Sequence, residues 1–336
     1  MTDTREHGII VIGASAGGVE ALQRLAACLP PTLPAAVFVV LHIGPRFSAL
    51  PEILSRAGTL PACHAVDGAP IRPGRIYVAP PDHHLLITPG QMRLSRGPRE
   101  NRARPAIDVL FRSAAQAYGP QVVGVVLTGG LNDGTAGLVA IKAGGGITVV
   151  QEPDEAKCPG MPLSALRHAT IDHRLKLDDI PGLLARLAGP VPAPDPGMLP
   201  PEQSWTDLEA GLNEGYDLAR PLALTCPTCG GALAETQDSA LPCFTCHIGH
   251  RFVAADMDEA QFQAMERVLE MALRVLNERA ALCERMAGTW HGKGFDELAW
   301  RWRAARDEAR EKAEVLRGFI ENGWLRPDPD GETGDA

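Results

Sequence analysis

The sequence predicts an α/β fold: an open, mostly parallel, doubly wound sheet, plus a small zinc-ribbon-like module and a C-terminal helical hairpin. Apolar runs at residues 9–12, 35–41 and 122–127 have the composition of parallel strands that are buried on both faces. Glycine-rich turns and segments of helical periodicity follow the first and third runs. Beyond residue 188, a proline-rich spacer precedes paired cysteines and two long segments of helical periodicity.

The composition is that of a globular protein with more than one domain. The chain has 336 residues, 45% of them hydrophobic, so it can bury a sizeable core. No apolar run reaches membrane-spanning length and the first residues carry no signal-peptide pattern, so we expect a cytoplasmic protein without membrane insertion. A net charge of -9 argues against a nucleic-acid partner. In a reducing compartment the eight cysteines are not expected to form a disulfide framework.

The elements of the sheet domain follow from apolar periodicity and turn residues. In order, the sequence predicts a strand at 9–12, a helix at 19–29, a strand at 35–42, a helix at 51–57, a strand at 75–79, hairpin strands at 83–88 and 91–95, a helix at 105–118, a strand at 122–127, a helix ending at 143, a strand at 146–151, a helix after 162 and a final helix at 178–188. The hairpin interrupts the alternation of strands and helices.

A G-x-S-x-G pattern at residues 13–17 places Ser15 in the first strand-to-helix turn. Small neighbours allow such a turn to present the hydroxyl at the carboxyl edge of the sheet, which suits a nucleophile. Ser15 as a helix cap or a phosphate ligand is the alternative. A dinucleotide site is disfavoured because Ser15 occupies the second glycine position of that fingerprint, and His42 stands where a ribose-binding acid is expected.

Two further residues follow predicted strands and complete a candidate catalytic set. His42 ends the second strand, and Asp133 follows the third apolar run. Because the carboxyl ends of parallel strands share one edge, Ser15, His42 and Asp133 are expected to converge as nucleophile, base and orienting carboxylate. Asp133 as an ordinary helix cap is the alternative. The chain order Ser, His, Asp differs from the α/β-hydrolase order.

Five motifs in order make residues 5–188 resemble the catalytic domain of CheB-type chemotaxis receptor methylesterases. They are Gly-Ala-Ser-Ala-Gly-Gly at 13–18, Leu-His-Ile-Gly-Pro at 41–45, Arg-Pro-Ala-Ile-Asp-Val-Leu-Phe-Arg-Ser-Ala-Ala at 104–115, Leu-Thr-Gly-Gly-Leu-Asn-Asp-Gly at 127–134 and Gly-Met-Pro at 160–162. The resemblance implies hydrolysis of protein-glutamate methyl esters on chemoreceptor-type proteins, releasing methanol, and glutamine deamidation in some members. It implies Ser15 as nucleophile, His42 as base, Asp133 as orienter and no catalytic cofactor.

The sequence departs from this family in three respects. Ala16 and Gly130 stand where the family commonly has Thr and Met, so a hydroxyl beside the nucleophile is missing. The sequence also begins at the catalytic strand, without the N-terminal receiver domain of the family's usual form. A signalling adaptor with a vestigial active site, acting through its zinc module and helices, is therefore the alternative function.

A basic segment precedes the helix at 105–118 and is a candidate substrate-binding rim. Its predicted binding residues are Arg96, Arg99, Arg102 and Arg104. In the resembling family this region lines the mouth of the cleft, and positive charge would attract a glutamate-rich receptor helix. An ordinary solvated loop is the alternative. Met161, in the Gly-Met-Pro motif, is also predicted to bind substrate.

Two C-x-x-C pairs predict a structural zinc site. Spacing alone favours Cys226, Cys229, Cys243 and Cys246 as ligands, and free thiols are the alternative. Similarity to the C-terminal extensions of receiver-less methylesterases implies Cys226, Cys229, Cys246 and His250 instead, with Cys243 as alternate. Catalysis is expected to persist in residues 1–190 alone.

The predicted domain organisation has five parts. They are the catalytic domain 5–188, a Pro-rich linker 189–204, the zinc-ribbon-like module 205–255, a helical hairpin 256–323 and a disordered tail 324–336. The helices of the hairpin, 256–287 and 295–322, are expected to pack on each other, with a docking or dimerising surface for a partner as the alternative.

Overall fold

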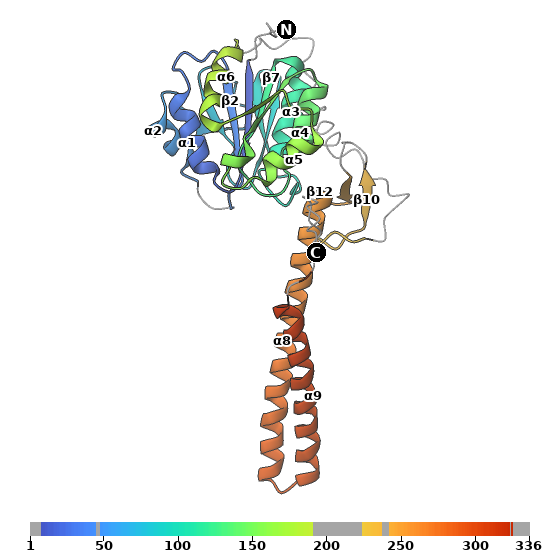
Figure 1. Ribbon diagram of the computed structural model, residues 1–336. Coiled ribbons are helices and arrows are strands. Elements are labelled where there is room, and N and C mark those ends of the chain that lie inside the picture. Colours follow the sequence, from blue (N-terminus) through green and yellow to red (C-terminus); the bar gives the residue numbers. More distant parts are fainter. Residues whose placement is uncertain (1–7, 45–47, 191–223, 237–241, 323, 325–336) are drawn as a thin grey trace. The chain divides into compact units, whose positions relative to one another are not determined.

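The structure is a computed structural model that describes residues 8–44, 48–190, 224–236, 242–322 and 324 (Figure 1). It contains two compact units, Met1–Met257 and Asp258–Ala336. Most of the predicted linker and tail, and residues 205–223 of the predicted zinc module, lie outside the described residues.

A seven-stranded parallel sheet forms the centre of the first unit and confirms the predicted fold class. Its strand order is β3-β4-β2-β1-β7-β8-β9. The strands are β1 Ile9–Ala14, β2 Ala36–Leu41, β3 Ala62–His64, β4 Ile76–Val78, β7 Val122–Val126, β8 Ile147–Gln151 and β9 His173–Leu175. The short outer strands β3 and β9 were not predicted, because their residues are only partly buried or exposed and form no apolar run, unlike the equally short β4.

Helices cover both faces of the sheet, as Figure 1 shows. One core contains residues of α1 Gly18–Cys28, α2 Leu50–Ala57 and α6 Ile180–Leu187, and the other those of α3 Ile107–Tyr118, α4 Thr135–Ala143 and α5 Gly160–His168. Strand β1 contributes Ile10 and Ile12 to the first core and Ile9 and Val11 to the second. This two-sided burial explains its continuous β-branched run.

The predicted hairpin forms from β5 His84–Thr88 and β6 Gln91–Ser95, outside the main sheet. It packs on α3, where the hydroxyl of Ser113 accepts the amide of Ile87 at 3.0 Å. The hydroxyl of Tyr118 accepts the amide of Gly90 at 2.7 Å. These contacts attach β5 and the hairpin turn to α3.

The cysteine-rich segment forms a three-stranded antiparallel sheet of β10 Leu233–Thr236, β11 Cys243–Cys246 and β12 Arg251–Val253. It belongs to the first compact unit. A bridge between Glu100 and Arg251 joins β12 to the loop before α3.

The second unit is the predicted helical hairpin, built from α8 Ala254–Gly292, which begins in the first unit, and α9 Asp296–Glu321. Its most buried side chains are small: Ala280, Cys283, Ala287, Ala299, Ala309 and Ala313. Phe319 of α9 is 52% exposed. Val268, Met271 and Val275 are also exposed. Among the described residues, no helix is long and apolar enough to cross a membrane.

Candidate active site and metal site

Ser15 lies in the turn that follows β1, and its position is fixed by the backbone. Its amide donates to the carbonyl of Thr128 at 2.9 Å, which links the turn to the end of β7. Gly17 has a φ of 78°, a left-handed conformation that glycine adopts without strain. A Cβ at Gly18 would lie 2.6 Å from Leu41, so only glycine lets α1 start this close to the sheet.

His42 directly follows β2 and contacts both other members of the predicted triad. Its Nδ1 lies 3.2 Å from Oγ of Ser15, and its Nε2 lies 2.7 Å from Oδ2 of Asp133. An ionised carboxylate can only accept hydrogen bonds, so Nε2 is the protonated nitrogen when His42 is neutral. Nδ1 then has a lone pair directed at the serine hydroxyl, which is the arrangement required of a general base.

Asp133 is buried and oriented by several donors. It accepts the amides of Ile107 at 2.7 Å and Asp108 at 3.1 Å, and the side-chain amide of Asn101 at 2.8 Å. It therefore caps α3 rather than the helix that follows it in sequence, and it orients His42 as well. Burial alone would raise the pKa of Asp133, but the hydrogen bond and charge of His42, with the amide of Ile107, lower it to about 2.

Two residues of this network were not identified from the sequence. Asn101 donates from its side-chain amide to Asp133 and also, at 2.8 Å, to Oδ2 of Asp108. Oδ1 of Asp108 accepts the amides of Gly134 at 3.0 Å and Gly137 at 2.6 Å. Burial and the charge of Asp133 raise the pKa of Asp108. The sequence signal for Asp108 was an acidic residue beside the apolar face of the predicted helix. The sequence contains no such signal for Asn101.

The predicted substrate arginines have different surroundings. Arg104 and Arg96 both pair with Asp82, at 2.7 and 2.6 Å. Arg104 also donates to the carbonyls of Arg96 at 3.0 Å and Gly97 at 2.7 Å, so it holds the loop together. Arg99 donates to the carbonyl of Arg102 at 3.4 Å. The hydrogen bonds from Arg96 and Arg104 lower the pKa of Asp82 to about 2.

Met161 has no exposed surface, so the structure places it beneath the site rather than at its mouth. Its amide donates to the carbonyl of Gly129 at 2.8 Å. A Cβ at Gly129 would lie 2.1 Å from Sδ of Met161 and 2.8 Å from Cβ of Ser15. Met161 therefore supports the serine turn from the core, and a direct contact with substrate is not available to it in this conformation.

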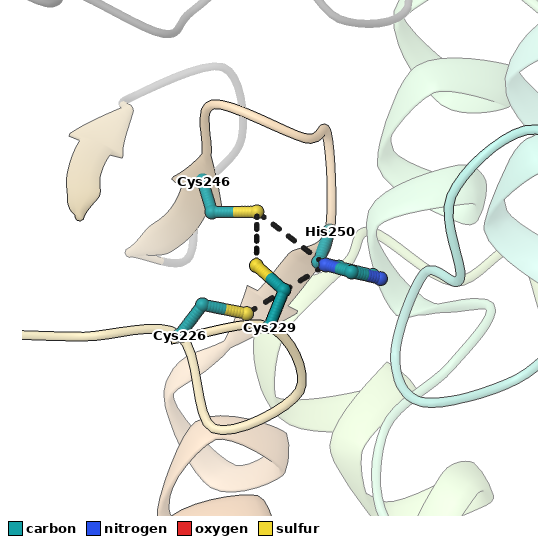
Figure 2. Close-up of side chains that lie close together, drawn as sticks. All are labelled: Cys226, Cys229, Cys246 and His250. Atoms are coloured by element: carbon teal, nitrogen blue, oxygen red, sulfur yellow. Dashed lines mark hydrogen bonds between the residues drawn. The ribbon is translucent and has the colours of Figure 1, made fainter. Parts of the chain in front are cut away.

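Cys226, Cys229, Cys246 and His250 converge in the cysteine-rich sheet, with one ligand atom of each within 4.8 Å of all the others (Figure 2). The Sγ atoms of Cys229 and Cys246 are 3.6 Å apart, and Sγ of Cys246 and Nδ1 of His250 are 3.5 Å apart. Tetrahedral zinc, with bonds of about 2.3 Å to sulfur and 2.0–2.1 Å to nitrogen, requires separations of about 3.8 and 3.6 Å. These four residues therefore fit zinc.

Cys243 is outside this group and lies beside Arg251. The structure thus assembles the ligand set implied by the resemblance rather than the four-cysteine set. The turn between the first two ligands is tight: the amide of Gly230, at a φ of 74°, donates to the carbonyl of Cys226 at 2.8 Å. Zinc here would cross-link the turn at Cys226 to β11 and to the start of β12.

The structure thus combines a doubly wound parallel sheet with serine, histidine and aspartate in hydrogen-bond contact beyond its carboxyl edge, which is the geometry of a serine hydrolase in a chain order other than that of the α/β-hydrolase fold. The sequence profile of the CheB methylesterase family matches residues 10–184, more than half of the chain. The chain therefore belongs to the CheB methylesterase family, and the prediction that it is an ester hydrolase is confirmed at the level of the family.

Individual relatives support the same family assignment. The chain is 40% identical over 180 residues to a Leptospira interrogans protein, a match covering 53% of this chain and 93% of that protein. It is equally identical to protein-glutamate methylesterase/protein-glutamine glutaminase 2 of Anaeromyxobacter dehalogenans, over 53% of each chain. The crystal structure of the Thermotoga maritima CheB methylesterase catalytic domain matches with a TM-score of 0.53 and 33% identity, covering 55% of this chain and all of that one.

Proposed function

We propose that this protein hydrolyses methyl esters of glutamate side chains on chemoreceptor-type proteins and releases methanol, with Ser15, His42 and Asp133 as its catalytic residues. The observation that carries the proposal is the continuous contact from Ser15 through His42 to Asp133. It lies within the region that matches the family. The names of several relatives add a glutaminase activity, so deamidation of receptor glutamines belongs to the proposal as a second reaction of the same site.

The contacts support one role for each side chain. His42 removes the hydroxyl proton of Ser15 through Nδ1 as Oγ attacks the ester carbonyl. The same proton then passes to the departing methoxy group, so methanol leaves and an acyl-serine remains. Water, deprotonated by His42, hydrolyses that ester and restores Ser15. Asp133 holds the ring through Nε2 and stabilises its cationic form in both steps.

The negative charge of the tetrahedral intermediate requires donors. Ala16 and Gly130 carry no side-chain donor, so we assign this role to backbone amides of the serine turn. The turn leads directly into the eleven-residue helix α1, whose N-terminal dipole also favours negative charge.

The loop arginines support an acidic protein as the substrate. A chain of net charge -9 repels a glutamate-rich helix over most of its surface, so local positive charge is needed for encounter. Arg96 is 67% exposed in its side chain even though it pairs with Asp82. We therefore propose Arg96, Arg99 and Arg102 as the receptor-facing rim, with Arg104 as its support.

No cofactor is required for these steps, and we propose a structural role for zinc at Cys226, Cys229, Cys246 and His250. We also propose that the protein is cytoplasmic, because its proposed substrate is the signalling part of a chemoreceptor-type protein. A partner for the exposed face of the helical hairpin also stays a prediction.

The test is methanol release from a receptor protein carrying methyl-labelled glutamate esters. We expect release by the native chain and none above background by Ser15→Ala. If both proteins release nothing and a small neutral ester is also untouched, the adaptor function replaces the enzymatic one.

A further inference from the structure

The cysteine-rich sheet contacts the loop that carries Asn101. The amide of Asn101 donates to the carbonyl of Arg251 at 3.0 Å, and the amide of Arg251 donates to the carbonyl of Arg99 at 3.4 Å. Glu100 and Arg251 thus pair as a parallel bridge, with 8% and 7% of their surfaces exposed. Strand β12 therefore acts as an additional backbone partner for residues 99–101.

Charged side chains of opposite sign meet at this contact. Arg112 of α3 holds Glu100 by two hydrogen bonds, both of 2.6 Å. Burial raises the pKa of Glu100, but the charges of Arg112 and then Arg251 lower it below its usual range. Glu100 thus interacts with one guanidinium from the catalytic sheet domain and one from the cysteine-rich sheet, so the contact is electrostatic as well as backbone-mediated.

The contacted loop has a conformation that needs support. Asn101 and Arg102 have φ values of 48° and 62°, a left-handed region that costs free energy for residues other than glycine. Such conformations persist when the surroundings hold them. Asn101 is 6% exposed, and its side chain bridges Asp133 and Asp108, so a shift of this loop moves the donor that orients Asp133.

The metal site is adjacent to the same strand. His250 immediately precedes Arg251, and its carbonyl accepts the amide of Cys246 at 3.0 Å. A zinc ion bound to Cys226, Cys246 and His250 would fix the start of β12 relative to the rest of its sheet. In such small modules the binding free energy of the metal is largely folding free energy, so metal loss would loosen β12.

We propose that metal binding at Cys226, Cys229, Cys246 and His250 controls catalysis, because it holds β12 against residues 99–101 and so positions Asn101 on Asp133. Asn101 is a positioning residue in this scheme and zinc acts as a structural input to the active site. The proposal rests on the proposed function, since its output is turnover by Ser15.

The test is made in the full chain and compares removal of zinc with removal of the side-chain amide of Asn101. Turnover of a small neutral ester is measured before and after a zinc chelator, with zinc content as the check. We expect chelation and Cys246→Ser each to lower kcat on the order of 10-fold with little change in KM, since substrate contacts are untouched while His42 is misoriented. The matched control, Cys28→Ser, changes an exposed cysteine outside the metal group and keeps full turnover.

Asn101→Gly isolates the route of the effect. Glycine accepts the left-handed φ, so this variant removes the side-chain amide while tolerating the backbone conformation. We expect this variant to lower kcat as chelation does and to change the pH profile of kcat. Chelation should then lower the kcat of Asn101→Gly no further. An equal chelation loss in Asn101→Gly and in the native chain would show that zinc acts by another route and overturn the proposal.

Amide hydrogen exchange provides a readout that is independent of catalysis. On chelation we expect faster exchange at the amide of Asn101 and unchanged exchange in β1 and β7. Unchanged exchange at Asn101, or turnover that is indifferent to zinc in a protein that Ser15→Ala inactivates, would overturn the coupling and leave the proposed function standing. Absence of ester hydrolysis would instead count against the proposed function, while exchange at Asn101 would still decide the coupling.

Discussion

At the scale of residues, the three candidate catalytic side chains were predictable because each follows a strand of a parallel sheet. Ser15, His42 and Asp133 lie close together for that topological reason. Asn101 was not predictable in the same way, because its loop is brought to Asp133 by the hairpin and by β12, and the left-handed backbone leaves no periodic signal. Pairing of Arg104 with Asp82 likewise depends on a turn that sequence patterns do not place.

We expect Ser15→Ala, His42→Ala and Asp133→Ala each to remove most turnover, and their losses not to add. Loss of any one member disables the unit, so the serine and histidine changes should cost on the order of 10⁴-fold or more in kcat, and the aspartate change somewhat less. Steady-state kinetics of the single and double variants checks this. Near-normal turnover in Asp133→Ala would show that Asp133 only caps α3.

The lowered pKa of Asp133 predicts an acid-dependent loss of stability. Because its folded-state pKa of about 2 is below the unfolded value near 3.8, the stabilisation is present above about pH 4 and disappears as the pH falls toward 2. A shift of this size corresponds to about 2 kcal/mol. We expect the difference in unfolding free energy between the native chain and Asp133→Asn to shrink by about this amount from pH 4 to pH 2, measured by chemical denaturation. A difference that stays constant over this range would contradict the assignment.

At the scale of elements, long apolar strands and amphipathic helices were predicted well because burial dictates their periodicity. The hairpin of β5 and β6 was predicted from its turn residues. Helix α3 begins at Ile107 rather than at residue 105, because Asp133, which is distant in sequence, accepts the first helical amides. Such a boundary is set by tertiary contacts that a local pattern does not contain.

The loop before α3 is expected to act electrostatically. Changing Arg96, Arg99 and Arg102 to Ser should lower kcat/KM on receptor several-fold at low ionic strength and flatten its salt dependence, because steering of an anionic helix is lost. Hydrolysis of a small neutral ester should be unchanged. Arg24→Ser is the matched control, since Arg24 is an exposed arginine whose partner, Asp178, lies outside this loop. Equal losses on both substrates would mean that the loop supports the fold instead.

At the scale of the whole molecule, the cysteine spacing predicted a metal site, and the fold selects among its ligands. We expect the full chain to bind one equivalent of zinc, with binding lost in Cys226→Ser and kept in Cys243→Ser, because Cys243 lies outside the four-residue group. Zinc content after dialysis against a weak chelator measures this. Loss of zinc in both Cys226→Ser and Cys243→Ser would restore the four-cysteine alternative, and retention of zinc by Cys226→Ser would require another site.

The contact of β12 with residues 99–101 also changes an expectation drawn from sequence. Residues 1–190 alone were predicted to keep catalysis, because the proline-rich spacer separates them from the cysteines in sequence. In the structure the cysteine-rich sheet returns to the loop that holds Asn101. Spacing along the chain cannot reveal such a return, and we now expect the shorter chain to turn over more slowly than the full one.

The central claim, that Ser15 is a nucleophile activated by His42, is tested most directly by covalent labelling. A fluorophosphonate reacts with an activated serine hydroxyl and leaves unactivated hydroxyls largely unmodified. Peptide mass spectrometry of the labelled full chain should place the phosphonate on Ser15 in the native protein and find little label in His42→Ala. A native chain left unlabelled at Ser15, or labelled equally in His42→Ala, would contradict the account.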